Sequence, residues 1–175
     1  MMSDAGASVH ASAVLVGERA VLIRGPSGAG KSRLAFDLIL AGRTGQIAAA
    51  VLVGDDRVFL DRREGRLMVR PARELAGLIE IHGLGIRRCD FRTEAMVGLV
   101  VDLCAPDAAR LPPPTALSVL ISGVKIPRIP ISQGTSALPL VVAALTTTEG
   151  ATYPDSSADC LKGIGNHITH TLATE

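Results

Sequence analysis

The chain has 175 residues, 47% of them apolar, and a formal net charge of +1. This length and composition indicate one ordinary domain with its own core and exclude a disordered chain. A charge so near zero argues against bulk binding of nucleic acid or of a membrane surface. No window approaches about 18 uninterrupted apolar residues, and the opening MMSDAGASVH lacks a signal-peptide pattern. We therefore expect a cytoplasmic protein whose three cysteines are reduced.

Short apolar runs separated by turn residues define the expected elements of the first half. Alternation indicates half-buried strands, apolar residues three and four apart indicate a helix, and a continuous apolar run indicates a strand buried on both faces. In chain order these patterns predict a hairpin of strands 10–16 and 20–25 turning at Gly17, a helix 31–42 that stops at Gly42, a buried strand 47–54, and a hairpin 58–71 with Glu64 and Gly65 at its tip.

The second half is richer in glycine and proline. It predicts a short strand running into a glycine-rich loop over 77–88, a buried strand 96–104, a loop 105–114, edge strands and turns over 116–132, and a helix 138–148. Strands outnumber helices, and we find no internal repeat or long linker. Residues 1–175 are therefore expected to form a single α/β domain with a twisted mixed β-sheet.

The segment GPSGAGKS, residues 25–32, carries the strongest functional pattern. Its glycines and its Lys-Ser pair stand at P-loop spacing, after a predicted strand and before a predicted helix. Such glycines let backbone N–H groups surround a phosphate, the lysine reaches the β- and γ-phosphates, and the serine hydroxyl can ligate Mg²⁺. The pattern predicts that a nucleoside triphosphate or similar polyphosphate is bound by Gly25, Pro26, Ser27, Gly28, Ala29, Gly30, Lys31 and Ser32.

Carboxylates follow at two further places. Asp55 and Asp56 end a predicted buried strand, where acids of P-loop proteins hold a metal or accept a proton, and a solvated turn is the alternative. In an extended segment these two side chains would point to opposite faces. Glu80 lies within an apolar strand, where an unpaired buried carboxylate needs a cation nearby, unless the strand is an edge and Glu80 faces water. His10 alone reads as an ordinary hairpin histidine.

The segments GPSGAGKSRLAFDLI, VLVGDDRV and LIEIHGLGI, in this order, resemble the catalytic domain of HPr kinase/phosphorylase over roughly residues 8–145. That bacterial enzyme phosphorylates a regulatory serine of HPr, the phosphocarrier protein of the sugar phosphotransferase system. The resemblance implies a P-loop domain of the HPr kinase C-terminal type, a protein-serine kinase that uses ATP and Mg²⁺, HPr as substrate partner, and a homo-oligomer, hexameric in full-length members. Since only about nine residues precede His10, the chain is similar to the shortened α-proteobacterial type without an N-terminal domain.

The resemblance also implies a role for each matching position. His10 matches the family's active-site histidine and Lys31 its phosphate-binding lysine. Asp56 matches the acid/base that deprotonates the substrate serine, which leaves metal binding or local structure to Asp55. The remaining matches are the magnesium ligands Ser32 and Glu80, and Arg128 as a further active-site arginine.

Two segments depart from the family pattern. His82 stands where the signature Glu-x-Arg-Gly-Leu-Gly-Ile has arginine, and PRIPISQGTSALP replaces a loop linked to the reverse reaction. We therefore expect kinase activity to outweigh phosphorylase activity. A nucleotide-sensing module without transfer and a small-molecule kinase remain alternatives. One hairpin is rich in arginine and has three possible interpretations: the lid of a small-molecule kinase, a docking surface for a protein substrate, or a solvated face. Its arginines are Arg62, Arg63, Arg66, Arg70 and Arg73.

Overall fold

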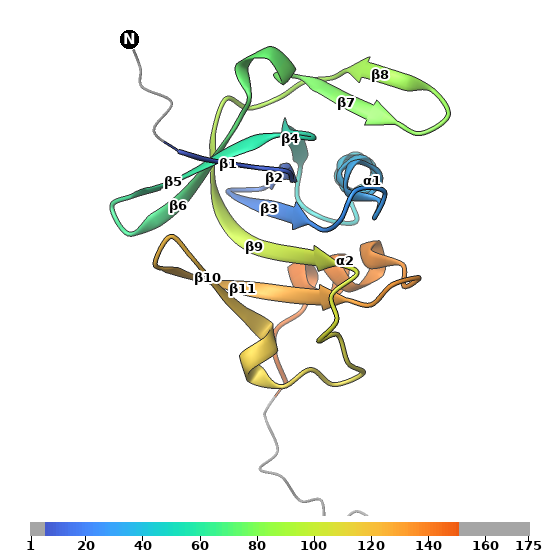
Figure 1. The fold of residues 1–175 in the computed structure, drawn as a ribbon. Coiled ribbons are helices and arrows are strands. Elements are labelled where there is room, and N and C mark those ends of the chain that lie inside the picture. The colour runs from blue at the N-terminus through green and yellow to red at the C-terminus, as the bar shows by residue number, and fades with distance from the viewer. Residues whose placement is uncertain (1–5, 151–175) are drawn as a thin grey trace, which may run out of the picture.

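A twisted mixed β-sheet with two helices on one face forms the body of the protein (Figure 1). The computed structural model describes residues 6–150. The main elements are β1 Ala7–Val9, β2 Ser12–Val16, β3 Arg19–Arg24, α1 Lys31–Arg43, β4 Ala50–Gly54, β5 Val58–Arg63, β6 Arg66–Pro71, β7 Leu78–Ile81, β8 Gly85–Arg88, β9 Ala95–Leu103, β10 Ser118–Ile121, β11 Val124–Ile131 and α2 Ala137–Thr146. Short 3₁₀ turns occupy Arg73–Leu75 and Pro114–Leu117. This architecture confirms the expected α/β class.

Three strands of the sheet, β3, β9 and β11, run parallel to one another. β9 pairs in parallel with β3 on one side and with β11 on the other. Antiparallel β2 and β4 continue the sheet beyond β3, while β6, β5 and β1 continue it from the first residues of β9. The β7–β8 hairpin is a separate two-stranded sheet whose β7 contacts α1 (Figure 1). The loop after β3 and the ends of β4 and β7 thereby surround the start of α1.

β3, which has a strand on each side, is buried on both faces, and this explains its continuous apolar run. In β3, Val21 and Ile23 belong to the core that α1 and α2 cover. Ala20 and Leu22, which alternate with them, belong to a second core shared with the β5–β6 hairpin. No helix among residues 6–150 combines the length and the apolar character that a membrane span requires.

Both predicted hairpins are confirmed. The β2–β3 turn contains Gly17 with φ of 60°, and the β5–β6 turn contains Glu64 and Gly65 with φ of 50° and 76°. Two successive left-handed residues match the twist of the strands that they join. The predicted helix over 138–148 corresponds to α2, and free thiols are found at Cys89 and Cys104; Cys160 lies outside the described residues.

The helix after the P-loop motif does not stop at Gly42. α1 runs through Gly42 to Arg43, and the glycine with a left-handed φ of 75° is Gly45. A Cβ on Gly42 would lie 2.7 Å from the backbone nitrogen of Ala50. Gly42 therefore permits α1 to pack closely on β4, and Gly45 provides the helix stop that the sequence had assigned to Gly42.

Two other boundaries differ from expectation, and one prediction for the end of the sheet is confirmed. The strand expected over 47–54 begins at Ala50, because its partner β2 ends as the chain turns at Gly17. The glycine-rich end of 77–88 folds into β8 rather than a loop. Within the described residues β11 has one neighbour at a time, β10 along 124–127 and β9 along 128–131. Each part of β11 therefore has a free edge that tolerates proline, which confirms the predicted edge strand.

Candidate active site

The loop between β3 and α1 has a backbone suited to glycine. Gly28 and Gly30 have φ of 77° and 93°, in the left-handed region. Gly30 directly precedes α1, and the structure of residues 6–150 shows no side-chain cap at this helix start. The first N–H groups of α1 and the positive end of its dipole are therefore available to an anion in front of the loop.

Lys31 is buried, and its ammonium group is held inside the loop. Nζ donates hydrogen bonds to the carbonyl oxygens of Gly25 at 3.0 Å and Pro26 at 3.1 Å. The side chain is only 6% exposed. The loop thus keeps a positive charge beside the place where the P-loop pattern puts the β- and γ-phosphates.

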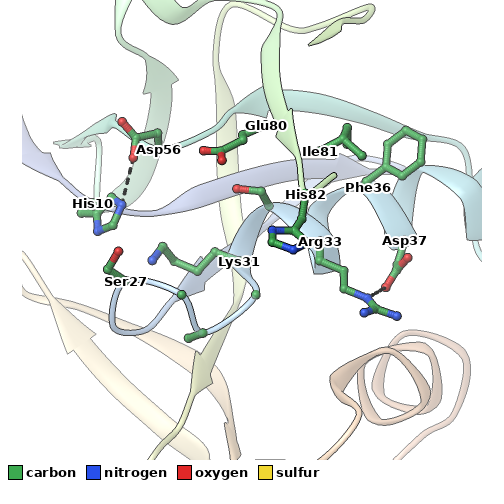
Figure 2. Close-up of a pocket in the computed structure, with 14 residues that line it drawn as sticks. His10, Ser27, Lys31, Arg33, Phe36, Asp37, Asp56, Glu80, Ile81 and His82 are labelled. Atoms are coloured by element: carbon green, nitrogen blue, oxygen red, sulfur yellow. Dashed lines mark hydrogen bonds and ion pairs between the residues drawn. The ribbon is translucent and has the colours of Figure 1, made fainter. Parts of the chain in front are cut away.

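A cavity of about 850 Å³ opens above this loop. Figure 2 shows that loop side chains face residues from the chain before β2, from the β4–β5 turn and from β7 across this space. Among the predicted site residues, Gly25, Pro26 and Arg128 do not line it. The predicted residues that do are His10, Ser27, Gly28, Ala29, Gly30, Lys31, Ser32, Asp56 and Glu80, and His82 joins them.

Asp55 and Asp56 point in different directions because a tight turn separates them. The Arg57 N–H donates to the Asp55 carbonyl oxygen at 2.8 Å, and Asp56 has a left-handed φ of 65°. Such a three-residue turn is strained for a residue with a side chain, and strain of this kind gathers at functional sites. Asp55 is 3% exposed, whereas the Asp56 side chain is 69% exposed. The expected divergence is confirmed, with a turn rather than an extended segment as its cause.

Asp56 is held at the rim of the cavity by His10. Nε2 of His10 and Oδ1 of Asp56 lie 2.9 Å apart (Figure 2). A carboxylate with one oxygen engaged in this way keeps a second oxygen as a proton acceptor. The pair can therefore orient a general base in a position that solvent and a partner can reach.

The buried Asp55 carboxylate connects the loop to two neighbouring strands. Its Oδ1 accepts hydrogen bonds from Oγ of Ser32 at 2.9 Å and from Oγ of Ser12 at 2.5 Å. Its Oδ2 accepts one from the Glu80 N–H at 3.1 Å. Ser12 was not among the predicted site residues, although a serine within the apolar strand 10–16 was an available signal.

The oxygen atoms around Ser32 suit a magnesium ion. Mg²⁺ prefers hard oxygen ligands and is usually bound through one or two carboxylates together with substrate phosphates. The Ser32 hydroxyl and the Asp55 carboxylate beside it supply such oxygen atoms. Glu80 is exposed, as its water-facing alternative required, and its carboxylate, which lines the same cavity, would complete the set. No cluster of three or more His, Cys, Asp or Glu side chains fit to hold a metal occurs among residues 6–150. A magnesium ion beside Ser32 would take its remaining ligands from the phosphates of a bound nucleotide.

Comparison with known proteins identifies the family. The model of the HPr Serine kinase C-terminal domain matches residues 3–161. The chain belongs to this family. The solved structure of the Hpr(Ser) kinase/phosphatase from Coxiella burnetii matches with a TM-score of 0.63 and 27% identity, covering 79% of this chain and 93% of that one. The HPr kinase-type fold expected from the motifs is confirmed.

Curated members of the HPr kinase family match a shorter stretch. The HPr kinase/phosphorylase of Mycoplasma mycoides is 38% identical over 80 residues, which are 46% of this chain and 23% of that protein. The HPr kinase/phosphorylase of Streptococcus thermophilus is 42% identical over 80 residues, 45% of this chain and 24% of that protein. The matched stretch therefore spans less than a quarter of the length of these relatives.

Arg128, which the HPr kinase resemblance placed in the active site, lies outside the cavity lining. Its guanidinium donates to the carboxylates of Asp102 and Asp107 and to the Ala116 carbonyl. Arg24, the residue before the loop, donates to both oxygens of Asp102 at 2.7 Å. Since Arg24, Asp102 and Arg128 belong to β3, β9 and β11, their ion pairs connect the three parallel strands next to the loop. In this structure Arg128 holds β11 and the loop after β9 together.

The Asp102 ion pairs predict an acid-dependent loss of stability. Burial alone would raise the pKa of Asp102, but hydrogen bonds from Arg24 and Arg128 outweigh it and bring the pKa below the ordinary 3.8. A carboxyl group with a lowered folded pKa contributes stability that is present above pH 3.8 and is lost as the pH falls through the folded pKa. We expect Asp102→Asn to lower the free energy of unfolding by about 2 kcal/mol at neutral pH.

Urea unfolding of Asp102→Asn and wild type at a series of pH values checks this expectation. The difference between the two proteins should shrink once the pH falls below 3.8. Asp107→Asn is the matched control, because Asp107 also pairs with Arg128 but its side chain is 48% exposed, so its effect should be smaller. A stability difference that stayed constant down to the lowest pH would contradict the assignment.

The arginine-rich hairpin has no geometric support as a lid. Within the part of the chain that the structure describes, none of its arginines lines the cavity. Arg63 pairs with Asp61 and Glu94, and the Arg70 guanidinium lies 4.7 Å above the centre of the Phe59 ring. These contacts weaken the alternative of a small-molecule kinase with an arginine lid.

Proposed function

We propose that the chain is an ATP-dependent protein-serine kinase that phosphorylates the regulatory serine of HPr, with this direction outweighing the phosphorylase reaction. The main support for this proposal is the composition of the cavity. It is lined by residues of the P-loop motif, by oxygen atoms suited to Mg²⁺ and by the exposed carboxylate of Asp56, which lies in a strained turn. Family membership and the names of the matched relatives support the same reaction.

The loop and the start of α1 bind the phosphates of ATP. Backbone N–H groups donate to phosphate oxygens, and Lys31 exchanges the carbonyls of Gly25 and Pro26 for the β- and γ-phosphates. When bound, Mg²⁺ neutralises charge that develops on the transferring phosphate. Ser32 and Glu80 would hold this metal. The Ser32 hydroxyl donates a hydrogen bond to Asp55, which leaves the lone pairs of the Ser32 oxygen available to it.

Asp56 is the general base for the substrate serine. The serine oxygen forms a bond to the γ-phosphorus, the bond from that phosphorus to the bridging oxygen of ADP breaks, and the serine proton passes to Asp56. The hydrogen bond with His10 orients the carboxylate. Because the Asp56 side chain is 69% exposed, a serine on the surface of a partner can reach it.

An apolar surface beside the cavity favours a protein substrate over a small molecule. Leu84 and Ile86 are 62% and 63% exposed. They belong to the β7–β8 segment that also carries Glu80 and His82 into the cavity. Exposed large apolar side chains grouped next to a site are typical of surfaces that contact another protein.

Transfer of labelled phosphate tests the proposal against its alternatives. The purified chain is incubated with γ-labelled ATP, Mg²⁺ and purified HPr, and the labelled site is located by mass spectrometry. We expect phosphate on one serine of HPr. ATP binding without any transfer would favour the nucleotide-sensing module, and transfer to small hydroxyl compounds but not to HPr would favour a small-molecule kinase.

Glu80→Gln should weaken the magnesium dependence far more than the fold. Glutamine keeps the shape of the side chain but loses the charge that attracts Mg²⁺. We expect the Mg²⁺ concentration for half-maximal transfer to rise by about 10-fold, on the scale of lost metal-site partners. A magnesium titration of the transfer rate measures this shift, with Glu18→Gln in the β2–β3 turn as the control. An unchanged requirement for Mg²⁺ would make Glu80 a structural residue.

A further inference from the structure

We propose that Ser12 is a positioning residue for magnesium-dependent nucleotide binding, acting through Asp55. The inference rests on the proposed function and deepens it. Ser12 lies outside the three segments that carry the family resemblance, and it does not line the cavity. Its hydroxyl instead contacts the carboxylate that holds the Ser32 hydroxyl.

Within residues 6–150, the polar or charged residues that are buried as whole residues lie at this site. Among the described residues, the buried polar or charged ones are Ser12, Lys31 and Asp55. Ser12 is 0% exposed in β2, on the face that also presents Val14 to the core under α1. A hydroxyl kept in such a place costs free energy unless it is hydrogen-bonded. The Ser12 hydroxyl donates to Oδ1 of Asp55 at 2.5 Å, so the role of Ser12 is to hold this carboxylate.

Three hydrogen bonds hold the Asp55 carboxylate, and each comes from a different part of the fold. Ser12 donates from β2 and Ser32 from the start of α1, both to Oδ1. The Glu80 N–H donates from β7 to Oδ2. With both oxygens engaged, the plane of the carboxylate is set before any ligand binds.

The orientation of Asp55 decides where the Ser32 oxygen points. A serine hydroxyl has one proton, and when Ser32 donates it to Asp55 the lone pairs of its oxygen remain for a metal. Without the Ser12 hydroxyl, Asp55 loses one of two donors on Oδ1, and its carboxylate can rotate toward Ser32. Partners that orient a metal ligand from outside its coordination shell typically contribute about 10- to 100-fold in metal affinity.

Nucleotide binding measured with and without magnesium tests the inference without relying on transfer. Calorimetric titration with a non-hydrolysable ATP analogue is performed in Mg²⁺ and in EDTA. Ser12 acts through Asp55 and not on Ser32 itself, so for Ser12→Ala we expect the affinity in Mg²⁺ to fall by no more than about 10-fold, the lower end of that range, while the affinity in EDTA is unchanged. Ser12→Thr keeps the hydroxyl and should restore the magnesium effect, even if its extra methyl group lowers the melting temperature.

Val14→Ala is the matched control. Val14 is 0% exposed on the same strand and the same face, so its truncation weakens the core without touching Asp55. Its melting temperature should fall while its magnesium effect stays that of the wild type. If Val14→Ala loses the magnesium effect as Ser12→Ala does, or if Ser12→Ala keeps it, the inference is overturned. Wild-type binding that is equally strong in EDTA would instead overturn the proposed metal site itself, and the role of Ser12 with it.

Discussion

Lys31→Ala is expected to lower phosphoryl transfer to HPr by at least about 10²- to 10³-fold, the scale for loss of one donor to developing charge. Lys31 is 6% exposed and bonds to the loop carbonyls of Gly25 and Pro26, so its ammonium is already in the loop before ATP binds. Its loss removes the positive charge nearest to the β- and γ-phosphates. Initial rates of label transfer at saturating ATP measure the loss.

Two further variants separate lost charge from a damaged loop. Lys31→Met fills the buried space with an uncharged side chain and should be as inactive as the alanine variant. Lys125→Ala removes one positive charge from the exposed start of β11 and should transfer at the wild-type rate. Wild-type transfer by Lys31→Met would end the interpretation of residues 25–32 as a phosphate-binding loop.

Asp56→Asn should lose most of the transfer rate, about 10²- to 10⁴-fold, because a general base contributes on this scale. The fold should persist, since asparagine tolerates the left-handed φ of 65° found at this position. Affinity for ATP should be unchanged or slightly higher with one negative charge fewer near the phosphates. Single-turnover transfer and nucleotide affinity, measured on the same preparation, check both expectations.

Asp55→Asn provides the matched comparison. Asp55 is buried and accepts hydrogen bonds from Ser12, Ser32 and the Glu80 N–H. Its substitution should weaken magnesium-dependent binding or the local structure, with a smaller loss in the chemical step. Should Asp55→Asn transfer worse than Asp56→Asn at saturating Mg·ATP, Asp56 would not be the base.

Local pattern was enough to find most elements and the glycine-rich loop between β3 and α1. The spacing of GPSGAGKS, the alternation in β2 and β3, and the Glu64-Gly65 turn all depend on residues a few positions apart. Such neighbours constrain each other through backbone sterics in any fold. The same reasoning misplaced the end of α1, because the glycine at position 42 is required by the close packing of Ala50, which belongs to β4, and not by a helix end.

Contacts between distant residues were decided only by the tertiary structure. Ser12 and Asp55 are 43 residues apart, and Ser32 and Asp55 are 23 apart. Their meeting depends on the register of β2 and β4, which sets Ala13 opposite Gly54. A slip of one residue would turn Ser12 to the other face of the sheet. The partners of Arg128, in β9 and the loop after it, depend on parallel pairing in the same way. The sequence by itself therefore indicated the loop and the acids that meet at the cavity, because that prediction needs only local spacing, while strand register decided which distant side chains bond to them.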